Sequence, residues 1–544
     1  MGSSSDSSTP RGEAFVWFSG LGLIIGLGMV VGLLALVLMN GVTVFWAPPV
    51  PVAQVDDGRV LIGQLAKRRI RAGSPADQPR YERQYQVGLR ELNGNSYLWI
   101  DEAKIKGETF PADVLGLERV ENGPAFVRPQ TLRKSDGKII PATDAAFEAA
   151  FQAEVAAATA VREKLIDITR HRIGDVNASM DKARVALRRA EDLKLADDVA
   201  SLQKEIAALD GRFAALQEEA KQVVAGGAVA SLVSQDASGR EVVVPLTQVI
   251  RAWFPNRLDT WGRVKLFASR LGEFIFDEPR EANTEGGLMP AIFGTLVMTV
   301  FMSLLVTPFG VITAIYLREY AQQGPVLRIV RISVNNLAGV PSIVFGVFGL
   351  GFFVYVLGGS IDQLFFADQL KYNNNTPVFG TGGLLWCSLT LALMTLPVVI
   401  VATEEALAAV PRGMREASLA TGAWKWQTIR DLLLPASAPG ILTGLILAMA
   451  RGAGEVAPLM LVGVVKLAPT LPFDGTAPFL HMDRKFMHLG FYVYDLGFQS
   501  PDSDAARPMV FATTLLLIVL VVCLNLGAIW IRNRLRARFK GASF

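Results

Sequence analysis

The sequence has few of the side chains that most often carry covalent or metal chemistry. Only 2 cysteines and 3 histidines occur among its 544 residues. Cys387 and Cys523 both lie in apolar runs, which excludes a disulfide framework and a cysteine-based metal site elsewhere in the chain. His481 and His488 are close enough in sequence to share a loop, but we expect no metal site there.

The sequence also lacks the glycine-rich motif that binds ATP phosphates, because G-x-x-x-x-G-K-[ST] occurs nowhere in it. No arrangement of a nucleophile with a base stands out. Glu404 and Glu405 are adjacent carboxylates, which a solvated helix terminus explains better than catalysis. The net charge of +3 gives no indication of nucleic-acid binding. We therefore expect a protein without an enzymatic site of its own and without a cofactor.

Apolar residues are abundant instead. Hydrophobic residues make up 51% of the chain and charged residues 19%, which fits a membrane domain joined to a sizeable soluble domain. The first apolar run is too long for a signal peptide and lacks a small-x-small cleavage site, so we expect a retained helix. Six segments are long enough to span a bilayer of about 30 Å: residues 15–44, 289–317, 332–357, 384–401, 441–465 and 509–531.

Residues 47–286 contain no such span and form a predicted α+β soluble domain. Short alternating runs such as 59–63 and 97–100 predict strands in its first part, and a strand pair is expected within 229–249. Two heptad-like ladders, one from Ile166 to Leu187 and one from Val199 to Leu216, are out of register and predict an antiparallel helical hairpin or coiled coil. Residues 253–276 either lie on the membrane surface or pack as an amphipathic helix.

Basic residues set the orientation. They gather in the loop after the second span, between the fourth and fifth spans, and after the last span. All three places fall on one side if the spans alternate, and this side is expected to be cytoplasmic. Both termini are then cytoplasmic, and residues 47–286 are periplasmic. The expected domains are 1–46 (tail and first helix), 47–286, 287–535 (with a cytoplasmic loop at 402–440) and 536–544 (a basic tail).

One charged stretch between two spans has the pattern of a docking element. Small residues follow Glu416 at Ala417 and Ser418, so that one helical face can be approached closely. Gly422 is suited to end that helix, because glycine takes left-handed backbone angles without a steric cost. Leu434 and Pro435 close the stretch, and Pro435 is expected to end or kink a helix. This spacing resembles the EAA loop of ABC-importer permeases, with Ser418 in place of the usual alanine.

A second constellation lies in the fifth expected span. Arg451 and Glu455 are four residues apart, so both fall on one face if the helix continues. Gly452 and Gly454 leave room for another backbone or for a solute. Arginine suits oxyanions, and ionisable groups inside a membrane face a bundle interior or a polar path. The alternative is an ion pair that only locks helices together.

Several segments resemble phosphate-importer permeases of the PstA type. These are residues 336–346 (NLAGVPSIVFG), 447–459 (LAMARGAGEVAPL), Gly294-Thr295 and 314–320 (AIYLREY). The resemblance covers 287–465 well and 509–535 loosely, and residues 47–286 are an insertion relative to short members. One departure is Ala402 before Thr403-Glu404, where many relatives carry arginine. An anion-guiding role at this place then falls to another residue or to the partner permease.

The resemblance implies an α-helical polytopic membrane protein with about six spans and the type I ABC-importer permease fold. It implies an inner-membrane permease subunit of an ATP-driven phosphate importer. The implied partners are a homologous second permease, two ATP-binding subunits that hold the docking loop, a periplasmic phosphate-binding protein and membrane lipid. A permease for another oxyanion and a membrane sensor whose domain at 47–286 detects a ligand are the alternatives. No cytoplasmic signalling domain is evident for the sensor.

Overall fold

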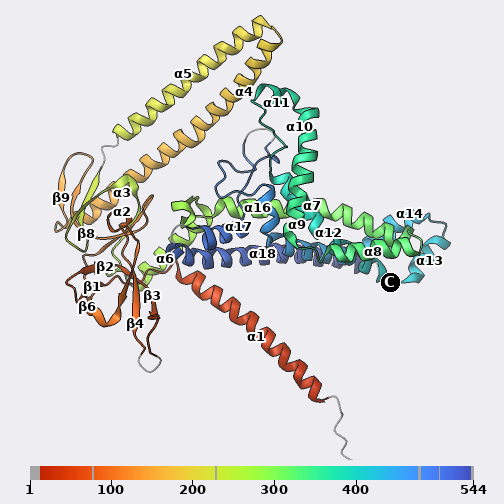
Figure 1. Cartoon of the computed structure of the whole chain (residues 1–544), viewed down its shortest axis with the longest axis horizontal. Helices are drawn as coiled ribbons and strands as arrows, with labels where there is room; N and C mark the ends of the chain where they lie inside the picture. The colour runs from red at the N-terminus through yellow and green to blue at the C-terminus, as the bar shows by residue number, and fades with distance from the viewer. Residues whose placement is uncertain (1–12, 76–78, 227–229, 476–478, 501–502, 541–544) are drawn as a thin grey trace, which may run out of the picture.

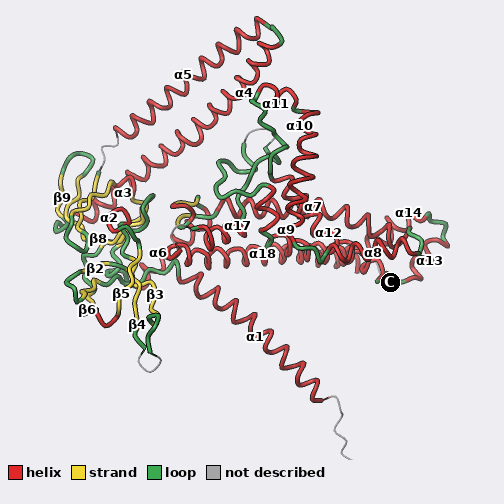
Figure 2. Tube along the Cα trace, viewed as in Figure 1, coloured by secondary structure: helices red, strands yellow, loops and turns green. Residues whose placement is uncertain are grey.

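The computed structural model describes residues 13–75, 79–226, 230–475, 479–500 and 503–540. Two parts are joined end to end: a β-rich unit that carries a long helical hairpin, and an elongated helical bundle (Figure 1). Strands gather in the unit at one end of the bundle (Figure 2). The ends of the chain that we expect to be cytoplasmic tails lie partly outside the described residues.

Six helical segments are long and apolar enough to cross a membrane: Val16–Thr43, Met289–Tyr320, Ser342–Phe365, Leu384–Ala408, Lys425–Ala453 and Ser503–Arg534. This agrees with the expected number of spans, but two of them are displaced. The third span begins at Ser342 rather than near residue 332. The helix is interrupted at Gly339–Pro341, because proline disfavours a helical conformation of the residue before it. The fifth lies at 425–453 rather than at 441–465.

The helices of this α-helical protein are α1 Glu13–Thr43, α2 Arg90–Asn93, α3 Phe147–Ile166, α4 Ile173–Asp192, α5 Ala196–Gly226, α6 Thr260–Phe276, α7 Met289–Ile315, α8 Pro325–Leu337, α9 Ser342–Phe348, α10 Gly359–Phe365, α11 Ala367–Tyr372, α12 Leu384–Ala408, α13 Arg412–Ala420, α14 Lys425–Gln427, α15 Leu434–Ala453, α16 Ala457–Val462, α17 Leu489–Tyr494 and α18 Ser503–Lys540. Wider π-helical segments are η2 Asp167–Arg172, η5 Tyr316–Tyr320, η6 Gly349–Gly358, η7 Thr428–Leu433 and η8 Asp495–Gln499.

The inserted unit contains antiparallel sheets in the order β2-β1-β6, β3-β4-β5 and β11-β10-β8-β7-β12, with β9 paired to β8 and a small β13-β14 ladder. Register aligns Leu232 of β10 with Leu132 of β8 and Val244 of β11, and all three are buried against α3. The expected strands near 59–63, 97–100 and 229–249 are therefore confirmed. The strands are β1 Val52–Val55, β2 Val60–Ile62, β3 Gln64–Ile70, β4 Tyr81–Gln86, β5 Tyr97–Asp101, β6 Ile105–Thr109, β7 Leu115–Arg119, β8 Ala125–Arg133, β9 Ile139–Pro141, β10 Ser231–Gln235, β11 Glu241–Pro245, β12 Val249–Trp253, β13 Pro279–Arg280 and β14 Glu285–Gly286.

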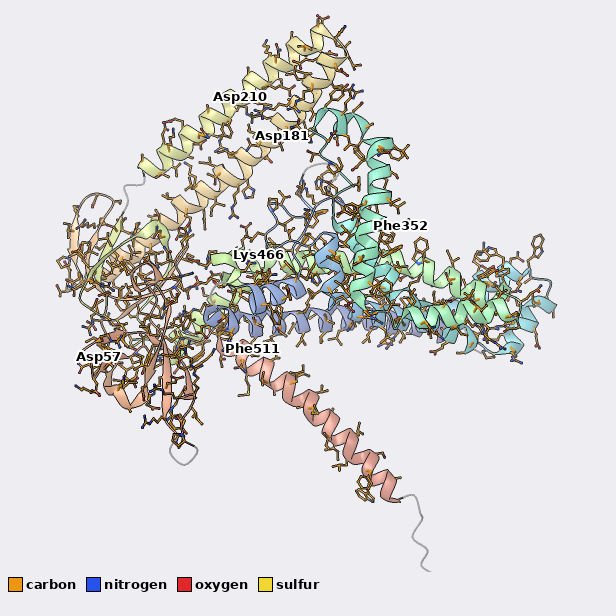
Figure 3. The ribbon with its side chains drawn as sticks, viewed as in Figure 1. Asp57, Asp181, Asp210, Phe352, Lys466 and Phe511 are labelled. Carbon is orange, nitrogen blue, oxygen red and sulfur yellow. The ribbon has the colours of Figure 1, made fainter. Side chains whose placement is uncertain are left out.

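The expected antiparallel hairpin is present as α4 and α5, whose arms carry Asp181 and Asp210 (Figure 3). Met180, Leu209 and Leu216 are buried between the arms. Ile166, the first residue of the expected ladder, is exposed instead, because the π-helical η2 rotates the register and buries Ile168 in its place. The turn needs neither glycine nor proline, since Lys194 takes a positive φ of 55°.

The tip of this hairpin touches the bundle. Arg188 donates to the Tyr372 carbonyl and to Asn374 Oδ1, both at 2.9 Å. Arg189 lies 3.1 Å from Asp368. Lys371 pairs with Asp192, which also accepts a 2.6 Å hydrogen bond from the Tyr372 hydroxyl. The hairpin therefore starts in the β-rich unit and ends on α11, which follows α10 (Figure 1).

The bundle is organised around α12, which packs against α7 and α15. Small residues allow this close approach. A Cβ added to Gly444 of α15 would lie 2.5 Å from the Ala402 Cβ, and one added to Gly310 of α7 would lie 2.5 Å from a Val399 methyl. By contrast, most of α1 is exposed. It meets α18 near its end, where Gly41 faces Phe511, the residue labelled on α18 in Figure 3.

Candidate functional site

The docking stretch folds as a helix, a glycine turn and a second helix, as expected. Glu416, Ala417 and Ser418 lie on α13, which ends at Ala420. Gly422 follows with φ at 87°, in the left-handed region. Its N–H donates to the Leu419 carbonyl at 3.0 Å, and the next N–H, of Ala423, donates to the Ser418 carbonyl at 3.2 Å. These bonds close the end of α13 and reverse the chain.

Apolar side chains of this stretch point outward. None of the residues of α13 is buried. Trp424 has 79% of its surface exposed and Trp426 53%, and Met414 and Leu419 are also exposed. Clustered exposed aromatic and aliphatic side chains on a polar loop are typical of a protein-binding surface.

Specific contacts hold α13 against the bundle. Arg415 lies 3.4 Å from Glu319 at the end of the second span and also donates to the Leu407 carbonyl of α12. The Ser418 hydroxyl is 2.9 Å from that of Thr428. These contacts join α13 to the second span, to α12 and to the helix that follows.

The helix that follows continues through Pro435, although we expected this proline to end or kink a helix. The helical segment runs from Lys425 through η7 and α15 to Ala453, and Pro435 lies within its course rather than ending it. The wider π turns of η7 immediately precede Pro435, and the missing N–H of proline costs least where the regular ladder is already interrupted. Leu434 and Pro435 thus belong to the fifth span, and the loop outside the helices is shorter than 402–440.

Arg451 and Glu455 lie together but not on one helix. The Arg451 Nε is 3.9 Å from Glu455 Oε1. However, α15 ends at Ala453, so Glu455 lies in the break before α16. Gly454 ends the helix, and Pro458 cannot continue the ladder. The prediction that both residues lie inside a continuous fifth span is wrong, although their proximity is retained.

The pair lies at a partly open position. The Arg451 side chain is 35% exposed and that of Glu455 23%. Gly452, on another face of the same turn, is buried against α7, where an added Cβ would lie 2.4 Å from Met302 Sδ. Gly452 therefore serves helix packing rather than solute binding, whereas Gly454 has space around it. The 3.9 Å separation is longer than a close hydrogen bond between a guanidinium and a carboxylate, which is about 2.8 Å. Glu455 therefore does not use all the donor groups of Arg451.

An arginine that the sequence interpretation did not single out lies beside Thr403-Glu404. Arg331 of α8 is 3.6 Å from Glu404, and the two side chains are 36% and 20% exposed. Glu404 and Glu405 lie about one turn before the end of α12, and Glu405 is exposed as expected, whereas Glu404 is largely covered and pairs with Arg331. The signal in the sequence was weak: Leu327, Arg331 and Val334 share one face of α8, and the two apolar members are packed against α12.

The histidines do not meet. His481 bonds to Asp474 at 3.0 Å. His488 is buried, which lowers its pKa to about 3 and keeps it neutral, and its Nδ1 accepts the Gly490 N–H. Within the described ranges, no group of three or more His, Cys, Asp or Glu side chains could hold a metal ion.

These features define a multi-pass membrane protein with an exposed helix–turn–helix loop between its fourth and fifth spans. The family model described as "Binding-protein-dependent transport system inner membrane component" matches residues 306–539. "Phosphate transport system permease protein PstA 1" of Mycobacterium tuberculosis (strain CDC 1551 / Oshkosh) is 34% identical over 247 residues, which are 45% of this chain and 71% of that protein. The chain belongs to this family of ABC-importer permeases, and its relatives include members of the PstA type.

Another relative shows how far the likeness extends. "Phosphate transport system permease protein PstA" of Mycobacterium leprae (strain TN) is 39% identical over 191 residues, or 35% of this chain, and the match spans 56% of that relative's length. Among solved structures, the inward-facing MetNI methionine ABC transporter aligns with 46% of this chain and 95% of its own at 20% identity, with a TM-score of 0.34. The matched family model leaves residues 47–286 outside it.

Proposed function

We propose that the chain is the transmembrane permease subunit of an ATP-driven inorganic phosphate importer. The observation that carries the proposal is the loose Arg451–Glu455 pair at the end of an apolar span, 3.9 Å apart and partly exposed. A guanidinium with free N–H groups binds phosphate oxygens in a bidentate manner. The names of the relatives supply the choice of phosphate.

Glu455 has a defined part in this proposal. A protonated phosphate oxygen donates to its carboxylate, while Arg451 neutralises the anion. This arrangement favours an anion that still carries a proton, and a fully deprotonated oxyanion meets repulsion from Glu455 in a medium of low dielectric constant. The pair therefore supports phosphate over sulfate.

Coupling to ATP hydrolysis is assigned to Glu416, Ala417, Ser418 and Gly422, with Leu434 and Pro435 in the helix behind them. Two ATP-binding subunits hold α13, and their closure moves it. The continuous helix from Lys425 to Ala453 is roughly 40 Å long at 1.5 Å per residue. Movement at its first turn therefore reorients Arg451 near its other end and exposes the pair to one side of the membrane at a time.

The remaining assembly follows the same proposal. A homologous second permease completes the path, and a periplasmic phosphate-binding protein delivers the anion. Both termini are cytoplasmic and residues 47–286 are periplasmic, because basic residues collect on the side of the docking loop. Domain limits of 1–46, 47–286, 287–535 and 536–544 describe this organisation.

The test is phosphate uptake by the reconstituted complex. Arg451→Gln should lower uptake about 10- to 100-fold, because a hydrogen bond to a charged group contributes about 1.5–3 kcal/mol. Copurification of the ATPase subunits should persist. Arg451→Lys keeps the charge without the fork and should be intermediate. Competition by sulfate distinguishes a permease for another oxyanion. Normal uptake by Arg451→Gln, or failure caused only by dissociation of the complex, would mean that the pair is a structural lock.

A further inference from the structure

Helix α6 buries charged side chains beside the apolar Leu266 and Phe274. Its charged residues Arg270 and Glu273 are turned inward, with side chains only 15% and 10% exposed. Arg270 lies 2.7 Å from Glu118 of β7, and Glu273 lies 2.9 Å from Arg251 of β12. These pairs join the inner face of α6 to the sheet of the inserted unit.

The outer face of α6 is largely apolar. Trp261 is 64% exposed and Phe276 is 73% exposed, and Val264 and Ala268 between them are also exposed. These positions follow the helical repeat, so they form one stripe. Lys265 is the cation within it, 5.9 Å from the centre of the Trp261 ring. A helix of a soluble domain buries such a stripe and exposes its charges.

The position of α6 in the chain explains this exposed stripe. The Phe274 ring is 5.0 Å from Phe45, two residues beyond the end of α1. The Phe274 carbonyl accepts the Leu288 N–H at 2.8 Å, immediately before α7 begins. One span therefore ends and another begins beside α6, which lies between the β-rich unit and the end of the bundle (Figure 1).

We propose that the stripe Trp261, Val264, Lys265, Ala268 and Phe276 binds the lipid surface, at the boundary of headgroups and acyl chains in the leaflet where α1 ends and α7 begins. The helix that carries the stripe contacts the end of α1 and the start of α7. Indole rings favour this boundary, and a lysine reaches from it to lipid phosphates. The inserted unit is thereby held at the membrane by its last helix, a role that does not depend on the transported substrate.

The test measures where these positions lie relative to lipid. Trp261, Val264 and Ala268 are replaced singly by cysteine in the full chain carrying Cys523→Ser, since Cys387 is buried and escapes labelling. Each variant is spin-labelled and reconstituted in vesicles of phosphatidylethanolamine and phosphatidylglycerol. Collision with oxygen, which partitions into lipid, is compared with collision with a water-soluble nickel chelate. Ile139 of β9, exposed and apolar on the β-rich unit, is the matched control.

The oxygen-to-nickel accessibility ratio should be severalfold higher at the three α6 positions than at residue 139. A ratio at α6 equal to that of the control would place the stripe in water and overturn the proposal. Low accessibility to both reagents, with an immobilised spectrum, would show that a protein covers the stripe and would also overturn it. All labelled positions are exposed, so the substitutions leave the packing of the chain unchanged.

Discussion

Removal of the Arg188 side chain should release the hairpin from the bundle. Its guanidinium makes two 2.9 Å hydrogen bonds, to the Tyr372 carbonyl and to Asn374, across 184 and 186 residues of sequence. Each such bond contributes about 0.5–1.5 kcal/mol, so Arg188→Ala should lower the stability of the docked state, relative to the undocked state, by about 2 kcal/mol. The other contacts at this tip are two exposed ion pairs, which contribute little, and the hydrogen bond from the Tyr372 hydroxyl to Asp192.

This magnitude makes the undocked state visible. A loss of about 2 kcal/mol changes the ratio of docked to undocked molecules by a factor of about thirty. If the intact tip contact contributes about 3 kcal/mol, the parent protein is almost entirely docked, whereas roughly a tenth or more of Arg188→Ala molecules are undocked at any time. Because the hairpin is long, undocking moves its tip by many ångströms.

The assay is a pulsed electron-spin distance measurement. Spin labels are placed at Leu195, beside the tip, and at Leu364 of α10, both exposed, in the Cys523→Ser chain. The parent should give one narrow distance, and Arg188→Ala should add a longer, broad component. Arg184→Ala removes an exposed arginine one turn earlier on α4 and serves as the control. A single narrow distance in Arg188→Ala, or a broad distribution already in the parent, would refute the reasoning.

Two further predictions concern the docking turn and the junction of the inserted unit. Gly422 has a φ of 87° but open space around its missing Cβ. Gly422→Ala should therefore cost about 1 kcal/mol, Gly422→Val more and Gly422→Asn little. ATPase copurification should weaken most for Gly422→Val, less for Gly422→Ala and least for Gly422→Asn, and equal retention by all three would remove the turn from docking. Burial of Glu285 and the nearby Glu118 raise the pKa of the Glu285 carboxyl to about 7. The neutral carboxyl stabilises the folded state at low pH, and this stabilisation is lost as the pH rises through 7. Glu285→Gln should therefore raise the unfolding temperature of the detergent-solubilised chain at pH 8 but not at pH 5, whereas exposed Glu121→Gln should change neither.

Local features were predictable from the sequence because their causes are local. The end of α13 depends on one glycine that can take a left-handed conformation, and the hairpin depends on two apolar ladders interrupted by a polar stretch. Period-two alternation sufficed to locate β2 and β5. Each of these features follows from residues within a few turns or strands of one another, and the structure retains each of them, with Ile168 in place of Ile166 in the first ladder.

Features that depend on interrupted helices were predicted less well. A helix end was predicted at Pro435, where the helix continues, and no end was predicted after Ala453, where the helix stops. A proline in sequence indicates a helix end, yet a preceding π segment lets the helix continue through Pro435. Gly454 and Pro458 end α15 within an apolar run that hydropathy predicts to be one span. Hydropathy reports how far a segment is apolar, whereas the end of a helix depends on where its backbone bonds are satisfied.

The arginine–glutamate pairs show why the rest of the site was not predictable. Arg451 and Glu455 are close in sequence, so their proximity was evident even though the helix between them breaks. Arg331 and Glu404 are 3.6 Å apart but belong to α8 and α12, and nothing local to either residue indicates the other. The cation beside Glu404 thus comes from a different helix. Charge near a carboxylate in a membrane is required by solvation energetics, but which helix supplies it is decided by tertiary packing.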